Sequence, residues 1–179
     1  MRKTSLSAKE IKQLLQALND GLGQQGVVGE IYLVGGAVMC LAFHARPATK
    51  DVDAYFTPPQ IIRELARKLA DDFELPENWL NDAVKGYLSK KNDFTLYLDM
   101  SHLKVFHAVP EYLLAMKCLA MRLGPEFHDE SDIRYLLRYL NIENYKQATG
   151  VITRYYPLEQ FPQKTLYALE EMLAGGRKN

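Results

Sequence analysis

Residues 34–53 read VGGAVMCLAFHARPATKDVD, and this stretch carries most of the information about the architecture. The apolar run that ends at Val34 has the composition of a strand, and Gly35-Gly36 follows where a strand would turn into a helix. Without a Cβ atom, glycine lets the chain turn sharply and lets a phosphate approach the backbone amides at the start of that helix. The stretch therefore predicts a strand, a glycine turn and a helix that together can bind a phosphate.

Two aspartates close this stretch. Asp51 and Asp53 alternate with Val52, so in an extended strand both carboxylates project from one face and can share a divalent cation. Arg46 and Thr49 precede them and add a cation and a hydroxyl near the same phosphate-sized space. Taken singly, a glycine pair is commonly an ordinary turn and two alternating aspartates are commonly a solvated strand face. Their order along the chain favours a functional site.

This arrangement resembles motif one of the polymerase-beta-type nucleotidyltransferase superfamily, which has a Gly-Gly or Gly-Ser turn, a helix and then Asp-x-Asp. Residues 108–122, AVPEYLLAMKCLAMR, and residues 128–133, HDESDI, are similar to later motifs of its AbiE-toxin branch and of small bacterial proteins in that branch without an assigned substrate. The resemblance covers about residues 28–140.

The resemblance implies a metal-dependent enzyme that moves a nucleoside monophosphate from an NTP to an RNA, protein or small-molecule hydroxyl. Asp51 and Asp53 would hold Mg²⁺ or Mn²⁺, which prefer oxygen ligands and take others from the phosphates. Asp99 is the candidate third metal carboxylate, although the alternation around it is imperfect. The alternative is a catalytically silent nucleotide-binding, regulatory or interaction protein of the same fold. The family likeness also implies a toxin of a toxin–antitoxin or phage-defence system, with a cognate antitoxin as partner.

Lys117 lies among apolar neighbours, where a lysine is costly unless it is paired or solvated. It could be a lysine that extends to the surface at a helix edge, or a clamp on the phosphates. Asp129 and Asp132, on one helical face, could orient Lys117 and Arg122, or serve as a helix N-cap. The predicted catalytic residues are Asp51, Asp53 and Lys117, and the predicted nucleotide-binding residues are Gly35, Gly36, Arg46, Thr49, Arg122, Asp129 and Asp132.

Composition narrows the class of protein. The 179 residues carry 22 basic and 22 acidic side chains, so a general nucleic-acid coat protein is not expected, although a local basic patch could still bind RNA. No signal-peptide pattern or membrane-length apolar stretch is present, which predicts a cytoplasmic protein that does not bind a membrane. Cys40 and Cys118 are expected to be buried free thiols, and the four histidines show no ligand spacing.

The predicted fold class is α+β: a nucleotidyltransferase-type mixed sheet flanked by helices in residues 1–109, and a helical half in residues 110–179 packed on it as one compact unit. Trp79 is expected in the core rather than stacked on a base. Residues 175–179 are expected to form a frayed tail. Apolar spacing predicts a first helix that starts at Ala8 and is broken by glycines from Gly21 on, and another helix that begins at Pro58-Pro59. The other predicted helices are 37–43, 111–122, 129–140, 143–155 and 163–173. The predicted strands are 30–34, 51–56, 94–100 and 103–109.

Overall fold

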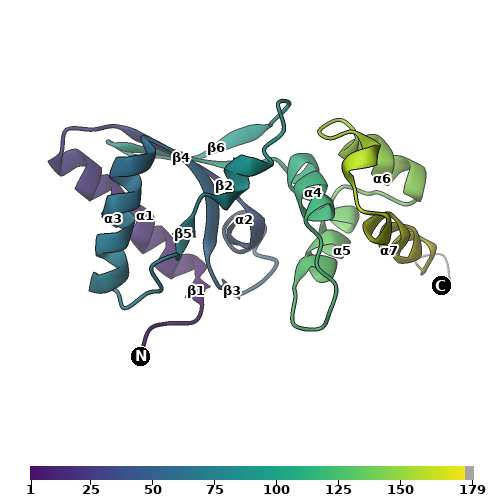
Figure 1. The fold of residues 1–179 in the computed structure, drawn as a ribbon, viewed down its shortest axis with the longest axis horizontal. Helices are drawn as coiled ribbons and strands as arrows, with labels where there is room; N and C mark the ends of the chain where they lie inside the picture. Colours follow the sequence, from purple (N-terminus) through teal and green to yellow (C-terminus); the bar gives the residue numbers. More distant parts are fainter. Residues whose placement is uncertain (176–179) are drawn as a thin grey trace. The chain divides into compact units, whose positions relative to one another are not determined.

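The computed structural model describes residues 1–175, so residues 176–179 of the predicted tail lie outside the described residues. The chain forms two compact units. The first contains Met1–Leu88 and Phe94–Ala108, and the second contains Ser89–Asp93 and the chain from Val109 on. Figure 1 shows helices and strands in the first unit and helices in the second.

The first helix, α1 (Ala8–Gln24), begins at a capping box. The Ser7 side chain accepts from the backbone of Glu10, and the Glu10 carboxylate accepts from the backbone of Ser7 at 2.8 Å, which satisfies two amides that have no partner inside the helix. The helix continues through Gly21 and Gly23, so the prediction that these glycines break it is wrong. A Cβ on Gly21 would lie 2.8 Å from the Leu65 side chain, and packing against that side chain favours glycine within the helix.

A five-stranded mixed sheet forms the centre of the first unit, in the order β5-β4-β2-β7-β6. Strand β2 pairs antiparallel with β4 and parallel with β7, and β6 pairs antiparallel with β7. A separate two-stranded sheet joins β1 to β3. The strands are β1 (Leu6–Ser7), β2 (Gly29–Val34), β3 (Ala48–Thr49), β4 (Val52–Thr57), β5 (Leu80–Asn81), β6 (Phe94–Asp99) and β7 (Leu103–Ala108).

Helices α1 and α3 (Pro59–Asp72) contact each other and pack on the same side of this sheet (Figure 1). A Cβ on Gly29 of β2 would meet Leu22 of α1 at 3.0 Å and Ile62 of α3 at 3.2 Å, so both helices lie against that face. Trp79 is 1% exposed and its Nε1 donates to the carbonyl oxygen of Ala66 at 2.9 Å, which confirms its place in the core. Helix α2 (Gly35–Leu41) and the 3₁₀ turn η1 (Ala83–Gly86) complete the unit.

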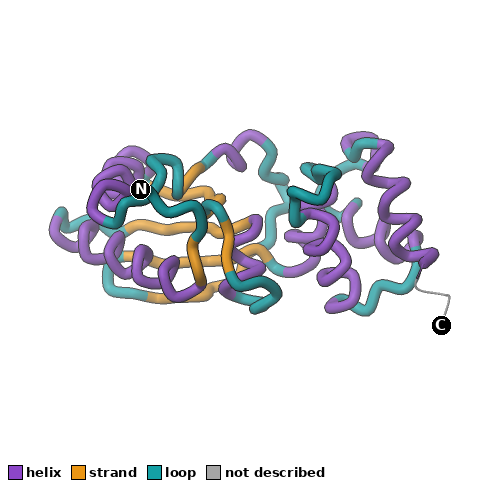
Figure 2. Tube along the Cα trace, turned by 90° about the horizontal axis from the view of Figure 1, so that it is seen from below, coloured by secondary structure: helices purple, strands orange, loops and turns teal. Residues whose placement is uncertain are grey.

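The second unit is helical, as Figure 2 shows by its colouring. Buried Tyr112 joins its parts: its hydroxyl accepts from the Ser89 amide at 3.0 Å, and its ring lies 5.0 Å from that of Tyr155. The elements are α4 (Pro110–Leu119), α5 (Asp129–Tyr139), α6 (Tyr145–Ile152), η2 (Leu158–Gln160) and α7 (Gln163–Ala174).

The prediction of an α+β fold is therefore confirmed, with a mixed sheet, flanking helices and a helical C-terminal half. The predicted helix and strand positions agree with the structure to within a few residues, except at the end of α1. Among residues 1–175, no helix has both the length and the apolar character needed to cross a membrane.

Candidate functional site

The first unit brings the glycine turn and the second aspartate together. Val34 pairs with Asp53, so the end of β2 lies beside the start of β4. Gly35 has a φ of 66°, in the left-handed region that favours glycine. A Cβ on Gly35 would lie 2.8 Å from Oδ2 of Asp53. The Asp53 carboxylate therefore lies directly against the turn, at a distance that only glycine allows.

Arg46 and Thr49 lie against the second glycine. A Cβ on Gly36 would be 1.6 Å from Nη2 of Arg46 and 2.7 Å from Oγ1 of Thr49. Nη2 of Arg46 donates to Oγ1 of Thr49 at 3.3 Å, and that hydroxyl donates to the backbone carbonyl of Asp51 at 3.2 Å. Thr49 is held in turn because it pairs with Leu6 between β3 and β1. The structure thus connects the cation, the hydroxyl and the first aspartate around Gly36.

Of the two aspartates, only Asp53 lies within a strand. Strand β4 begins at Val52, so Asp53 belongs to the sheet and Asp51 immediately precedes it. Both aspartates are half-buried. A role for the pair in binding one cation stays a prediction.

Asn81 is a neighbour of Asp53 that the sequence analysis did not single out. It pairs with Asp53 between the parallel strands β5 and β4, which places its amide beside that carboxylate on the sheet. Strand β5 has two residues, too short for the alternation that reveals a strand in a sequence.

The structure does not bring Asp99 to the same place. Asp99 pairs with Lys104, and Lys104 pairs with Glu30, four residues before Val34 on β2. At about 3.3 Å per residue and 4.8 Å per strand, Asp99 is roughly 19 Å from Asp53, at the opposite end of the sheet. This register corrects the assignment of Asp99 as a third ligand of that metal. Across residues 1–175, no group of three or more His, Cys, Asp or Glu side chains is arranged to hold a metal ion.

The second unit carries the predicted cluster of charged residues on α4 and α5. The Lys117 side chain is 8% exposed, and its Nζ lies 2.7 Å from Oδ2 of Asp132 and 3.9 Å from Oδ1 of Asp129. The Asp132 and Asp129 side chains are themselves 4% and 10% exposed. Lys117 is therefore a buried, paired cation, and the interpretation as a lysine that reaches the surface is wrong.

Asp129 connects this pair to Arg122. Its Oδ2 accepts from the backbone amide of Arg122 at 2.9 Å and from Nε of Arg122 at 3.0 Å. The Arg122 guanidinium also lies over the ring of Phe127, 4.6 Å from the centroid. The N-cap of α5 is His128, without a side-chain cap hydrogen bond, so capping does not explain Asp129. The two aspartates do orient the two cations; a role of this cluster in binding phosphate stays a prediction.

Both cysteines are buried and free, as expected. Burial raises the pKa of the Cys118 thiol to about 12, and the neighbouring Lys117 opposes this shift only in part. A thiol with that pKa is protonated at neutral pH and is a poor nucleophile, so Cys118 is a packing residue.

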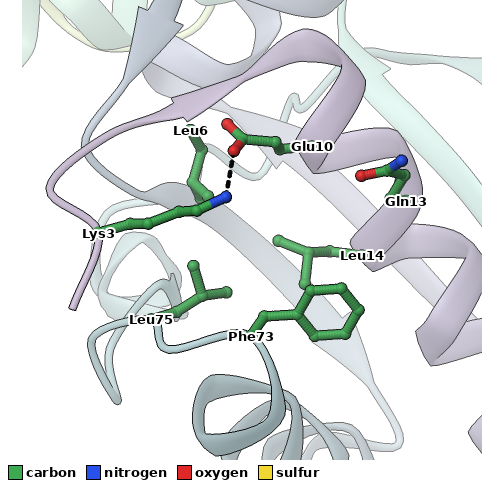
Figure 3. Close-up of a pocket in the computed structure, with 7 residues that line it drawn as sticks. All are labelled: Lys3, Leu6, Glu10, Gln13, Leu14, Phe73 and Leu75. Carbon is green, nitrogen blue, oxygen red and sulfur yellow. Dashed lines mark hydrogen bonds and ion pairs between the residues drawn. The ribbon is translucent and has the colours of Figure 1, made fainter. Parts of the chain in front are cut away.

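A small pocket lies between the N-terminal segment, α1 and the chain that follows α3 (Figure 3). The Lys3 ammonium forms an ion pair with the Glu10 carboxylate beside it, and the other walls are largely apolar. Its volume is about 20 Å³, room for a water molecule but not for a nucleotide. Its lining residues are Lys3, Leu6, Glu10, Gln13, Leu14, Phe73 and Leu75.

Comparison with known proteins gives one solved structure to report. It is the crystal structure of an antigenic nucleotidyltransferase-like protein from Paracoccidioides brasiliensis, 18% identical over 93% of this chain and 96% of that chain, with a TM-score of 0.49. Similarity at this level establishes no shared activity. No protein-family model and no curated protein matches the chain. The AbiE-toxin branch accordingly stays a prediction.

Proposed function

We propose that the chain is a metal-dependent nucleotidyltransferase that moves a nucleoside monophosphate from an NTP to a hydroxyl group of an RNA, a protein or a small molecule. The observation that carries the proposal is the glycine turn: Gly35 contacts the carboxylate of Asp53, and Gly36 contacts Arg46 and Thr49. A carboxylate, a guanidinium and a hydroxyl therefore meet at the glycine turn that follows β2.

The donor set suits Mg²⁺ or Mn²⁺. Carboxylate oxygens of Asp51 and Asp53 would hold the ion, and Mg²⁺ commonly takes only one or two protein carboxylates, with phosphate oxygens and waters as its other ligands. When bound, the metal would neutralise charge on the phosphates and lower the pKa of the attacking hydroxyl.

The chain's own residues would bind and orient the NTP. The Arg46 guanidinium presents planar donors that match phosphate oxygens, and its hydrogen bond to Thr49 fixes its position. Because Gly35 and Gly36 have no Cβ, the Asp53 carboxylate and the Arg46 guanidinium lie against the backbone of the turn, where a phosphate would meet them. In the transfer, the acceptor oxygen bonds to the α-phosphorus, the bond to the β-phosphate breaks, pyrophosphate leaves, and the hydroxyl proton is released to water.

A second candidate function is a nucleotide-binding or regulatory protein of the same fold without catalysis. The position of Asp99 favours it, because the register places this carboxylate at the opposite end of the sheet from Asp53. Loss of a third carboxylate would remove one source of transition-state stabilisation and leave nucleotide binding in place.

The test combines labelled NTPs, Mg²⁺ or Mn²⁺, and separate RNA, protein and small-molecule acceptors, with melting temperature as a second readout. A ligand at 100 times its Kd stabilises the folded state by about 2.7 kcal/mol. We expect label transfer and a raised melting temperature with the wild type. Both should be lost in Asp51→Asn/Asp53→Asn and kept in the control Asp71→Asn/Asp72→Asn, which makes the same charge change on α3.

The outcomes separate the two candidates. A shift that depends on Asp51 and Asp53, without transfer to any acceptor, supports the second candidate. An equal shift in the wild type and in the Asp51→Asn/Asp53→Asn variant contradicts the metal site. No shift in the wild type at millimolar NTP and metal contradicts both candidates.

A further inference from the structure

A row of apolar side chains crosses the face of the sheet that carries Asp53. Tyr55 on β4 pairs with Tyr32 on β2, which pairs with Phe106 on β7, which pairs with Leu96 on β6. Residues in register on neighbouring strands point to the same face, so these four side chains, the aromatic row, form one stripe.

The aromatic row is ordered by ring contacts and still reaches solvent. The rings of Tyr32 and Phe106 stack with centroids 4.7 Å apart and planes 8° apart, and Tyr32 also lies 5.9 Å from Tyr55. At the two ends of the row, Tyr55 is 40% exposed and Leu96 is 49% exposed. Contiguous apolar side chains that stay exposed on a folded unit commonly mark a binding surface.

The aromatic row lies next to the proposed catalytic site. Tyr55 and Asp53 are two residues apart on β4 and point to the same face, which separates them by about 7 Å. A group bound on the row at Tyr55 is therefore about two extended residue lengths from the carboxylate. The row spans three strand spacings, about 14 Å, which is the length of about four extended residues.

The charges around the aromatic row are mainly negative. The row of residues on one side of it contains Glu30, Lys104 and Asp99 in register, and Asp53 lies on the other side. Glu30 is positioned by the Tyr32 hydroxyl, which donates to its carboxylate at 2.5 Å. On the side of the row away from the glycine turn, the two carboxylates of Glu30 and Asp99 against one lysine, Lys104, oppose a polyanion and attract a cation, and the neighbouring rings favour a cation further.

We propose that the aromatic row binds a protein acceptor through an extended segment that alternates apolar and basic residues, and so presents a hydroxyl side chain of that segment near Asp53. That the bound protein is an acceptor rests on the proposed function. Binding of the segment itself does not require catalysis. Apolar side chains of the segment pack on Tyr55, Phe106 and Leu96, and its basic side chains pair with Glu30 and Asp99.

The test is fluorescence anisotropy with three labelled probes and no nucleotide: an octapeptide of lysine, leucine, phenylalanine and one serine, the same peptide with glutamate for lysine, and a single-stranded RNA octamer. The lysine peptide should bind, and the other two should bind at least tenfold more weakly. Tyr55→Ala should weaken binding of the lysine peptide about tenfold, because loss of an aromatic contact residue commonly costs on the order of such a change. The control Tyr167→Ala, at a residue 65% exposed on α7, should bind like the wild type.

A charge-reversal variant at Asp99 tests the electrostatic part of the binding, which does not depend on packing against the aromatic row. Asp99→Lys should weaken the lysine peptide and strengthen the glutamate peptide. The inference is overturned by equal binding of the two peptides, by no binding of the lysine peptide at millimolar concentration, or by an unchanged affinity in both variants. It is equally overturned when the RNA binds more tightly than the lysine peptide, or when Tyr55→Ala abolishes self-association of the chain. Because no NTP is present, none of these results depends on whether nucleotidyl transfer occurs.

Discussion

Replacing Lys117 by methionine tests the buried ion-pair cluster of the second unit. The substitution keeps the length of the side chain and deletes the charge. It leaves Asp132, whose side chain is 4% exposed, without the ammonium that lies 2.7 Å from it, whereas Asp129 keeps Arg122 at 3.0 Å. One buried carboxylate thus loses the ammonium of its ion pair.

The expected loss is about 3 to 5 kcal/mol in the free energy of unfolding, the usual result of removing one partner from a buried ion pair. At 2 to 4 °C per kcal/mol for a chain of this size, the melting temperature should fall by about 6 to 20 °C. A control on the surface should behave differently. Arg134→Met breaks the pair with Glu130, whose side chains are 45% and 53% exposed, and such pairs contribute about 1 kcal/mol or less.

Thermal and urea denaturation of Lys117→Met, Arg134→Met and the double variant Lys117→Met/Asp132→Asn provide the measurement. The double variant also removes the buried charge of Asp132, so it should recover at least half of the loss. A melting temperature of Lys117→Met within 2 °C of the wild type would refute the reasoning. Transfer measured in the folded double variant then tests the clamp, because loss of a donor to the transition state lowers the rate by about 10²- to 10³-fold.

Three further outcomes follow from the described contacts. Gly36→Val should abolish NTP-dependent stabilisation, because its Cβ would lie 1.6 Å from the Arg46 guanidinium and displace it. Gly86→Val, where a Cβ meets nothing within 4 Å, should keep this stabilisation. Equal NTP affinities of the two variants in titration calorimetry would mean that the glycine pair is an ordinary turn. The hydrogen bond from Lys3 lowers the pKa of Glu10 from 4.5 to about 2, so its contribution is present above pH 4.5 and lost as the pH falls towards 2; Glu10→Gln should flatten this acid limb of the stability curve, and a parallel curve would contradict the pairing. Trp79→Phe removes the hydrogen-bond donor to the Ala66 carbonyl and should lower the free energy of unfolding, measured in urea, by about 1 to 3 kcal/mol. An unchanged free energy of unfolding would contradict this hydrogen bond.

The local part of the site was predictable because it depends on residues close together in the sequence. The segment from Gly35 to Asp53 contains its own turn, helix and strand, so spacing alone indicated which groups meet. Lys117 was predictable for a different reason: a cation among apolar residues requires a partner, and two aspartates lay nearby in the sequence. Both predictions rest on a local energetic requirement rather than on tertiary detail.

The remaining features depend on contacts between distant segments. Gly23 remains helical where propensity predicts a break, and a Cβ there would lie 3.0 Å from the His102 ring of another element. The register of β6 includes a shift between Leu96 and Leu98, and this irregularity helps to determine where Asp99 lies. Alternation in a sequence gives the face of a strand, but not its position along its neighbour. The place of Asp99 at the far end of the sheet therefore could not be derived from spacing.

Two carboxylates instead of three change how the proposed site should respond to metal. With Asp51 and Asp53 as the protein ligands, most of the metal's coordination sphere would come from triphosphate oxygens and water. Metal and NTP would then increase each other's affinity by the same factor, because coupling between two bound ligands is reciprocal. Either ligand alone would stabilise the fold weakly, and both together strongly. A catalytic protein and a silent nucleotide-binding protein share this coupling, so thermal stabilisation locates the metal site, and only transfer of the label identifies an enzyme.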